Sequence, residues 1–333
     1  MSDIEEFAAQ TFCAFERACA AVPTLDRTLA LAGHEVQVRY AAPVLGPRFE
    51  PALAHLEGAV GASALAISPA LTIGCWEREA TGVLPPSPPW DIDDFLARGR
   101  IRGHFDGPVR VAYEEWARTL TVYERDRGRA ILYTGDAAVV PRWFDRAPFR
   151  TILTWWAVDR GLPLLHASGV GDGNGAVAIA GASGAGKSTT ALACLDAGLR
   201  LVGDDACLVR LDPEPTIFGV YARAKLEPDA LARLPALADL IVDRHDDQSL
   251  IDPGPRRCEA APLRAVLFPQ ITHTPTTRVG PIAAADAMKL LVRSTLHEGI
   301  GMVSGAATNE MKNASGRNAI PAASGEYPDT CCT

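Results

Sequence analysis

Residues 176–189 read AVAIAGASGAGKST, and this stretch decides the fold that the sequence predicts. The apolar residues 176–180 are typical of a buried strand, and they run directly into a glycine-rich segment that ends in Lys187 and Ser188. The pattern GxxxxGK[ST] over 181–188, between a strand and a helix, is the signature of a loop whose backbone N–H groups hold phosphate oxygens. We therefore predict an α/β domain that binds a phosphate-bearing ligand at the start of a helix.

The residue types in this loop suit a nucleoside triphosphate with magnesium. Glycines let the backbone turn its N–H groups inward, the lysine ammonium reaches the β- and γ-phosphates, and the serine hydroxyl is a magnesium ligand. ATP and Mg²⁺ are the expected cofactors. The predicted nucleotide-binding residues are Gly181, Ala182, Ser183, Gly184, Ala185, Gly186, Lys187, Ser188 and Thr189.

Two adjacent carboxylates follow the next predicted strand, which is Leu201–Gly203. A carboxylate at this place commonly holds magnesium, and a second one can accept the proton of an attacking hydroxyl. We predict that Asp204 and Asp205 form a catalytic pair and that Ser188 and Asp205 hold the metal. Which aspartate is the base stays open, and an exposed turn rich in Asp and Gly is the alternative interpretation.

One histidine precedes the loop-bearing strand. The segment PLLHASGV at 163–170 is predicted to be a strand that pairs with 176–180 through a glycine-rich hairpin. Neighbouring strands can bring the His166 imidazole close to the phosphate site, although a lone histidine more often has a structural role.

Residues 164–209, LLHASGVGDGNGAVAIAGASGAGKSTTALACLDAGLRLVGDDACLV, resemble the core of the bacterial HPr kinase/phosphorylase family and its HPr kinase-like relatives. More loosely, the resemblance extends over 148–296. It implies a P-loop kinase with a core like that of phosphoenolpyruvate carboxykinases, which transfers phosphate to a serine hydroxyl and binds magnesium. The residues that it implies are catalytic are Asp204, Asp205, His166 and Lys187, with the histidine assisting an aspartate that acts as general base.

The sequence departs from strict HPr kinases downstream of this core. Those enzymes carry a metal-binding glutamate and an Arg-Gly step where this chain has TIFGVYARAKLEP at 216–228, and Glu227 is a weak substitute. The expected acceptor is therefore a serine of another peptide or protein, not HPr. Three cations, Lys225, Arg256 and Arg257, are candidates for stabilising the transferred phosphoryl group, although solvated cations of this kind are commoner.

We predict three parts in the chain. Residues 1–146 form a β-rich α+β region for a substrate or partner, with an amphipathic helix at 2–21 and a hairpin at 28–40. Residues 147–298 form an HPr kinase-like domain, a mixed sheet with flanking helices. Residues 299–333 form a flexible or divergent tail that replaces the helix and strand with which the family normally continues.

The composition narrows the class of partner. A net charge of −8 with a pI near 5.4 lacks the basic field that nucleic-acid binding needs. We expect no membrane span or export signal, and eight cysteines without a CxxC pair fit reduced thiols in the cytoplasm. A homo-oligomer is possible.

The sequence thus predicts an ATP-dependent serine kinase. The alternative is a regulatory or assembly module that binds nucleotide with little or no kinase activity. Small-molecule chemistry of the carboxykinase kind is a third possibility, but it requires an arginine-lined pocket that the sequence does not make evident.

Overall fold

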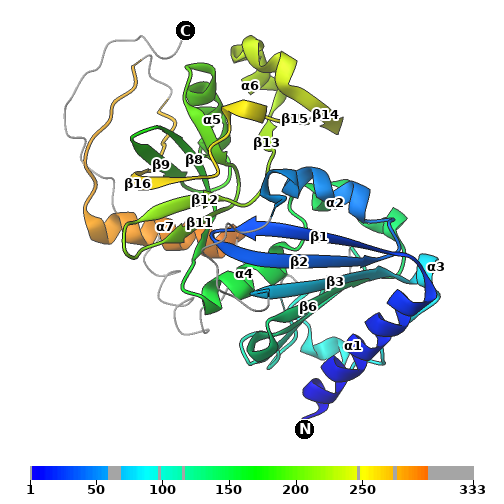
Figure 1. Ribbon diagram of the computed structural model, residues 1–333. Helices are drawn as coiled ribbons and strands as arrows, with labels where there is room; N and C mark the ends of the chain where they lie inside the picture. The colour runs from blue at the N-terminus through cyan, green and yellow to red at the C-terminus, as the bar shows by residue number, and fades with distance from the viewer. Residues whose placement is uncertain are drawn as a thin grey trace. The chain divides into compact units, whose positions relative to one another are not determined.

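The computed structural model describes residues 2–58, 69–96, 99–114, 117–245, 248–272 and 276–298. The chain forms two compact units, whose elements are labelled in Figure 1. Unit 1 comprises Met1–Pro163 and Val220–Arg223, and unit 2 comprises Leu164–Gly219 and Ala224–Thr333. The boundary that we drew between residues 146 and 147 therefore falls inside unit 1.

Unit 1 is built on a six-stranded mixed sheet with the strand order β1-β2-β3-β6-β5-β4. Strand β3 pairs in parallel with β2 and β6, and the other neighbours are antiparallel. The elements are α1 (Asp3–Ala21), β1 (Thr24–Leu31), β2 (His34–Ala41), α2 (Gly46–Leu53), β3 (Leu71–Glu77), α3 (Arg78–Thr81), β4 (Val109–Glu114), β5 (Thr119–Glu124), β6 (Arg129–Thr134) and α4 (Arg150–Asp159).

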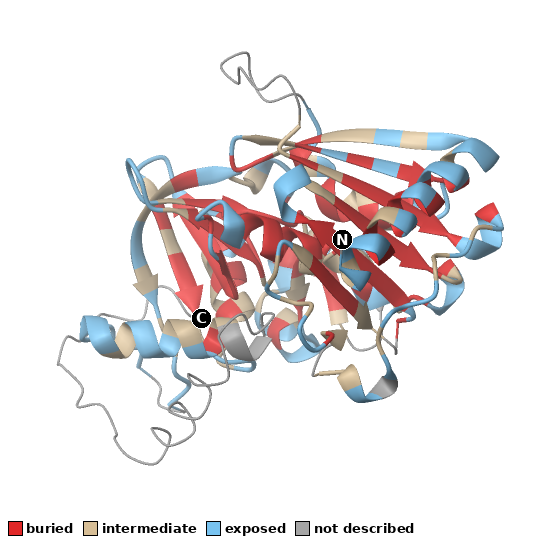
Figure 2. Ribbon diagram, turned by 90° about the horizontal axis from the view of Figure 1, so that it is seen from below, coloured by how far each residue is buried: buried red, intermediate tan, exposed pale blue. Residues whose placement is uncertain are grey.

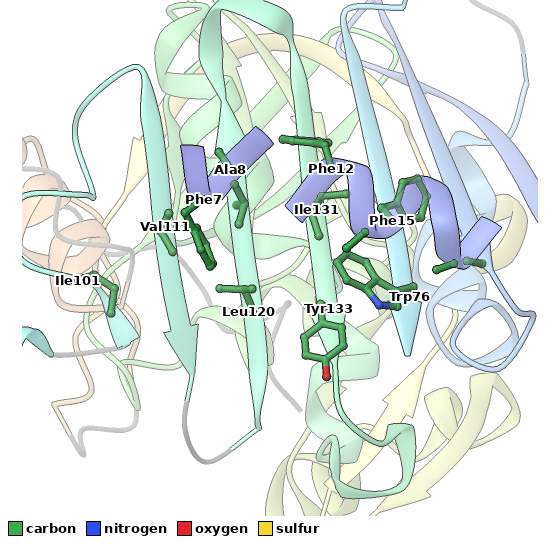
Figure 3. Close-up of a cluster of buried hydrophobic side chains, with 14 residues drawn as sticks. Phe7, Ala8, Phe12, Phe15, Trp76, Ile101, Val111, Leu120, Ile131 and Tyr133 are labelled. Carbon is green, nitrogen blue, oxygen red and sulfur yellow. The ribbon is translucent and has the colours of Figure 1, made fainter. Parts of the chain in front are cut away.

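Helix α1 covers one face of this sheet because its apolar residues recur at helical spacing. Figure 3 shows Phe7, Phe12 and Phe15 directed at the strands, and all three are buried. The ring centroids of Phe15 and Trp76 lie 5.9 Å apart. Burial of each such side chain contributes about 2 kcal/mol relative to exposure. The predicted helix at 2–21 is confirmed.

Helix α4 packs within unit 1, and this explains why the predicted boundary differs from the observed one. Trp155 and Trp156 are fully buried, as expected for core aromatics. At the same time, Arg110 of β4 forms a 2.6 Å ion pair with Asp159, which also accepts a 3.0 Å hydrogen bond from Tyr123. Sequence periodicity predicts the helix but not the unit to which it belongs.

Unit 2 contains a seven-stranded sheet with the order β10-β8-β9-β16-β12-β11-β7 and a three-stranded sheet with the order β13-β15-β14. Strands β9 and β16 pair in parallel, and the other neighbours are antiparallel. The elements are β7 (Leu164–Leu165), β8 (Ala167–Asp172), β9 (Gly175–Ala180), α5 (Lys187–Asp196), β10 (Arg200–Gly203), β11 (Cys207–Arg210), β12 (Thr216–Gly219), β13 (Ala224–Leu226), α6 (Pro228–Arg233), β14 (Ile241–His245), β15 (Gln248–Ile251), β16 (Ala260–Leu267) and α7 (Ala284–Glu298).

Helices pack on this larger sheet through two separate cores. Leu192 and Leu195 of α5 belong to a core with Val170 and Leu201, whereas Leu291 of α7 packs against a second core of sheet residues. Figure 2 shows many buried residues in the strands, although β16 at Ala260–Leu267 is mostly intermediate or exposed. A mixed α/β architecture with flanking helices, as the sequence predicts, is confirmed. None of the helices in the described parts of the chain has both the length and the apolar character needed to cross a bilayer.

A β-bulge sets the register at the edge of the larger sheet. Leu201 pairs with Val170 but Gly203 pairs with Gly169, so β10 holds one extra residue, Val202, between the two pairs. Strand β12 lies very close to this bulge. A Cβ on Gly219 would lie only 2.0 Å from the Val202 carbonyl oxygen. Glycine is therefore required at position 219.

One expectation needs correction, and another concerns residues that the structure does not describe. The segment 163–170 was expected to be one strand, but the chain changes partner at His166: β7 pairs with β11, whereas β8 pairs with β9 and β10. Long-range pairing decides such a change, and local sequence does not encode it. The predicted tail, 299–333, lies outside the described residues.

We predict that Gly219→Ala destabilises the protein by about 1–3 kcal/mol, because a Cβ there overlaps the Val202 carbonyl oxygen. Urea unfolding measures the effect. Gly173→Ala is the matched control, since a Cβ at Gly173 would meet no atom within 4 Å. Equal unfolding midpoints for the two variants would contradict this interpretation of the bulge.

Glu114, at the end of β4, is a part-buried acid in unit 1. Burial raises the pKa of its carboxyl to about 7 from the usual 4.5, although a 3.4 Å hydrogen bond from the Thr151 hydroxyl acts in the opposite direction. Between these two values the folded state therefore holds more of this proton than the unfolded state does.

The contribution of Glu114 to stability is thus fully present below about pH 4.5 and is lost as the pH rises through about 7. We predict that Glu114→Gln flattens this part of the stability profile, by at most about 1.4 kcal/mol for each pH unit. Urea unfolding of both proteins at several pH values measures the difference. A wild-type profile that runs parallel to that of the variant between pH 4.5 and 7 would refute the prediction.

Candidate active site

The glycine-rich loop (residues 181–186) connects β9 to α5. Gly184 and Gly186 have φ values of 79° and 92°, which side chains rarely tolerate, and Gly186 is the N-cap of α5. Helix α5 then starts at Lys187, so its first N–H groups and the positive end of its dipole face the loop. Backbone of this kind suits an anion.

Lys187 lies against the loop that precedes it. Its side chain is buried, and Nζ donates a 3.1 Å hydrogen bond to the carbonyl oxygen of Ala182. The ammonium is thus held beside the same backbone that is expected to hold phosphate oxygens. Its position agrees with the predicted role.

Asp204 is buried at the end of β10 and accepts three hydrogen bonds. The hydroxyls of Ser168 and Ser188 donate to Oδ1 over 2.5 and 2.9 Å, and the backbone N–H of Lys225 donates to Oδ2 over 3.1 Å. Its relative exposure is 2%. This carboxylate therefore joins the first turn of α5 to strands β8 and β13.

Burial raises the pKa of Asp204 above its ordinary value, and the neighbouring Asp205 adds to the rise. The hydrogen bond from Ser168 is the largest opposing contribution, followed by those from Lys225 and Ser188. The donors reduce the cost of burying the carboxylate without cancelling it.

Asp205 points to a different partner. Its Oδ1 lies 3.1 Å from Nε2 of His166, and its side chain is 36% exposed. His166 is buried between β7 and β8, and its other ring nitrogen, Nδ1, has no hydrogen-bond partner in the described part of the chain. Since Ala167 pairs with Ala180, the histidine lies next to the start of the glycine-rich loop.

The backbone between the two aspartates is strained. The N–H of Ala206 donates a 2.8 Å hydrogen bond to the carbonyl of Asp204, and Asp205 between them has a φ of 64°. A three-residue turn with positive φ at its centre is the rare form of the γ-turn. Strain of this kind persists where the surrounding structure enforces it, as it does at many functional sites.

The structure thus brings together most of the predicted site residues within unit 2, but it separates the two aspartates. The assignment of Ser188 and Asp205 to magnesium remains a prediction, and the hydrogen bond of Ser188 favours Asp204 for this position. An oxygen-only set formed by a serine hydroxyl and a carboxylate suits Mg²⁺.

The weaker candidates have other partners. Glu227 accepts a 2.6 Å hydrogen bond from Gln248, and Arg257 pairs with Asp252 at 2.8 Å. Lys225 reaches Asp204 through its backbone, which sequence reasoning did not consider. Ser168 was also missed, although its position two residues after His166 on a strand next to β10 was a possible signal.

No protein-family model matches the sequence, and no curated protein matches it either. Among solved structures the chain is similar to an HPr(Ser) kinase/phosphatase from Coxiella burnetii, with 17% sequence identity and a TM-score of 0.25. The likeness covers 36% of this chain and 73% of that chain. A TM-score this low supports no argument about the fold or the activity.

Proposed function

We propose that this chain is an ATP-dependent kinase that transfers the γ-phosphate to a serine hydroxyl of a peptide or protein. The observation that carries the proposal is the pairing of two adjacent carboxylates with different partners: Asp204 with Ser188, and Asp205 with His166. One carboxylate is thereby available on the metal side and the other for proton transfer. Nucleotide binding alone needs only the carboxylate on the metal side, whereas phosphoryl transfer also needs a group that takes the proton.

The nucleotide is held by the glycine-rich loop and α5. Bound Mg²⁺·ATP supplies the phosphoryl group, and the metal offsets its negative charge. The loop N–H groups and Lys187 bind the β- and γ-phosphates, while the Ser188 hydroxyl and Asp204 face the metal side. The positive φ values of Gly184 and Gly186 support this binding mode.

Asp205 is the better general base because it is accessible. Its side chain is 36% exposed, whereas Asp204 is buried and already accepts three hydrogen bonds. Asp205 takes the proton of the acceptor hydroxyl as the oxygen bonds to the γ-phosphorus. The bond from that phosphorus to the β–γ bridging oxygen breaks, and ADP leaves. His166 orients Asp205 through the 3.1 Å contact.

A second candidate function is a regulatory or assembly module that binds nucleotide with little or no transfer. It is favoured by the segment 216–228, where the glutamate and the Arg-Gly step of strict HPr kinases are replaced and where Glu227 pairs with Gln248. In both cases unit 1 is the proposed region for the substrate or partner, and a cytoplasmic location and a homo-oligomer belong to the same proposal.

We predict that Lys187→Ala weakens ATP·Mg²⁺ binding at least about tenfold, because it removes a charged hydrogen-bond donor from the phosphates. Calorimetric titration measures the affinity. Lys289→Ala is the matched control, since Lys289 is exposed in α7 and pairs with Asp286. Wild-type protein that binds no ATP·Mg²⁺, or a Lys187→Ala variant that binds it as well as wild type does, would disprove the nucleotide site.

We predict that Asp205→Asn lowers phosphoryl transfer by about 10²–10⁴-fold while ATP binding changes little, because an amide cannot accept the proton. Asn tolerates positive φ, so the turn is expected to persist. The assay is transfer from labelled ATP to candidate peptides encoded beside the gene, with mass spectrometry of the product. Asp239→Asn, at an exposed position in unit 2, is the control. Wild-type protein that releases ADP without labelling any acceptor would instead favour the regulatory module.

A further inference from the structure

We infer that Ser168 is a positioning residue for Asp204 that sets the metal dependence of the site, an inference that rests on the proposed function. Ser168 lies in β8, and none of its surface is exposed. Its hydroxyl donates a 2.5 Å hydrogen bond to Oδ1 of Asp204. Ser168 thus reaches the carboxylate from strand β8, whereas Ser188 reaches it from helix α5.

The two serines that share Oδ1 of Asp204 have different fates in the proposed reaction. Ser188, in the first turn of α5, would offer its hydroxyl oxygen to a bound metal, which would alter its hydrogen bond to Asp204. Ser168 belongs to the sheet and keeps its hydrogen bond. It therefore holds the carboxylate in place from the sheet side, while the Lys225 N–H holds the other oxygen.

The backbone fixes this contact. If the pairing of Leu201 with Val170 continued without interruption, Ser168 would lie opposite Gly203. The extra residue, Val202, shifts the register by one, so that Asp204 meets Ser168 instead. Because Gly219 has no Cβ, the Val202 carbonyl of the bulge fits against it.

The expected effect has a known scale. Groups that hydrogen-bond a metal-binding carboxylate orient it, and their loss typically costs about 10–100-fold in metal affinity. Removal of the Ser168 hydroxyl leaves Asp204 buried with one fewer donor, so the carboxylate is less well placed for the metal.

The test is the Mg²⁺ dependence of ATP binding to the full-length chain. For Ser168→Ala, the Mg²⁺ concentration that gives half-maximal ATP binding should rise about tenfold or more, while ATP affinity in EDTA stays unchanged. If Ser168 had a purely structural role, Ser168→Ala would lower stability without changing the Mg²⁺ concentration that gives half-maximal ATP binding. Ser294→Ala is the matched control, because Ser294 is a buried serine of unit 2 whose hydroxyl donates to Leu291 in α7.

Two further variants keep the test decisive. Ser168→Thr retains a hydroxyl and should restore the wild-type Mg²⁺ dependence at least in part. If Ser168→Ala does not fold, Ser168→Cys replaces it, since its size is similar and the thiol is a weak donor. In a double-mutant cycle with Asp204→Asn, the shifts in the urea midpoint should be non-additive.

The outcomes separate this inference from the proposed function. Wild-type protein that binds no ATP would contradict the proposed function and the inference together. If wild type binds ATP, an unchanged Mg²⁺ dependence in Ser168→Ala, or additive midpoint shifts in the cycle, would overturn the inference alone.

Discussion

The candidate site depends on one extra residue in β10. Val202 shifts the pairing with β8 by one position, and so Asp204, not Gly203, meets Ser168. In a sheet, a shift of one residue also exchanges the two faces, so the bulge decides where each following side chain points. Gly219 is part of the same arrangement, because only a residue without Cβ fits against the Val202 carbonyl.

The chemistry of Asp204 follows from its burial. A carboxylate removed from water loses much hydration energy, and its three donors are two hydroxyls and one amide, none of which carries a formal charge. Burial therefore dominates, and the pKa is raised. A divalent cation beside Ser188 would supply the positive charge that these donors lack, so the same burial that is costly in its absence would strengthen the attraction in its presence.

Local sequence patterns were sufficient for some of the elements but not for their partners. Helical spacing identifies the helix at 2–21, and the strand–loop–helix pattern around 181–188 is visible in the residue types alone. The contact of Ser168 with Asp204 could not be predicted in this way, because a bulge is decided by pairing between distant strands. For the same reason the change of partner at His166 was missed, and α4 was assigned to the wrong side of a boundary that tertiary packing determines.

The turn that follows Asp204 explains how neighbouring residues can have different functions. In an extended strand the side chains of Asp204 and Asp205 would lie on opposite faces. In a helix they would be separated by a rotation of about 100° around the helix axis. Here the positive φ of Asp205 reverses the chain sharply, so that one carboxylate stays buried against Ser188 while the next is partly exposed beside His166. Such strain costs of order 1–3 kcal/mol. Aspartate tolerates a positive φ better than most residues do, and other residues of this chain, Ala32, Ala42, Arg118 and Phe149, also adopt one. The turn therefore accounts for the separate directions of the two carboxylates, and the chemical role of Asp205 rests on its contact with His166.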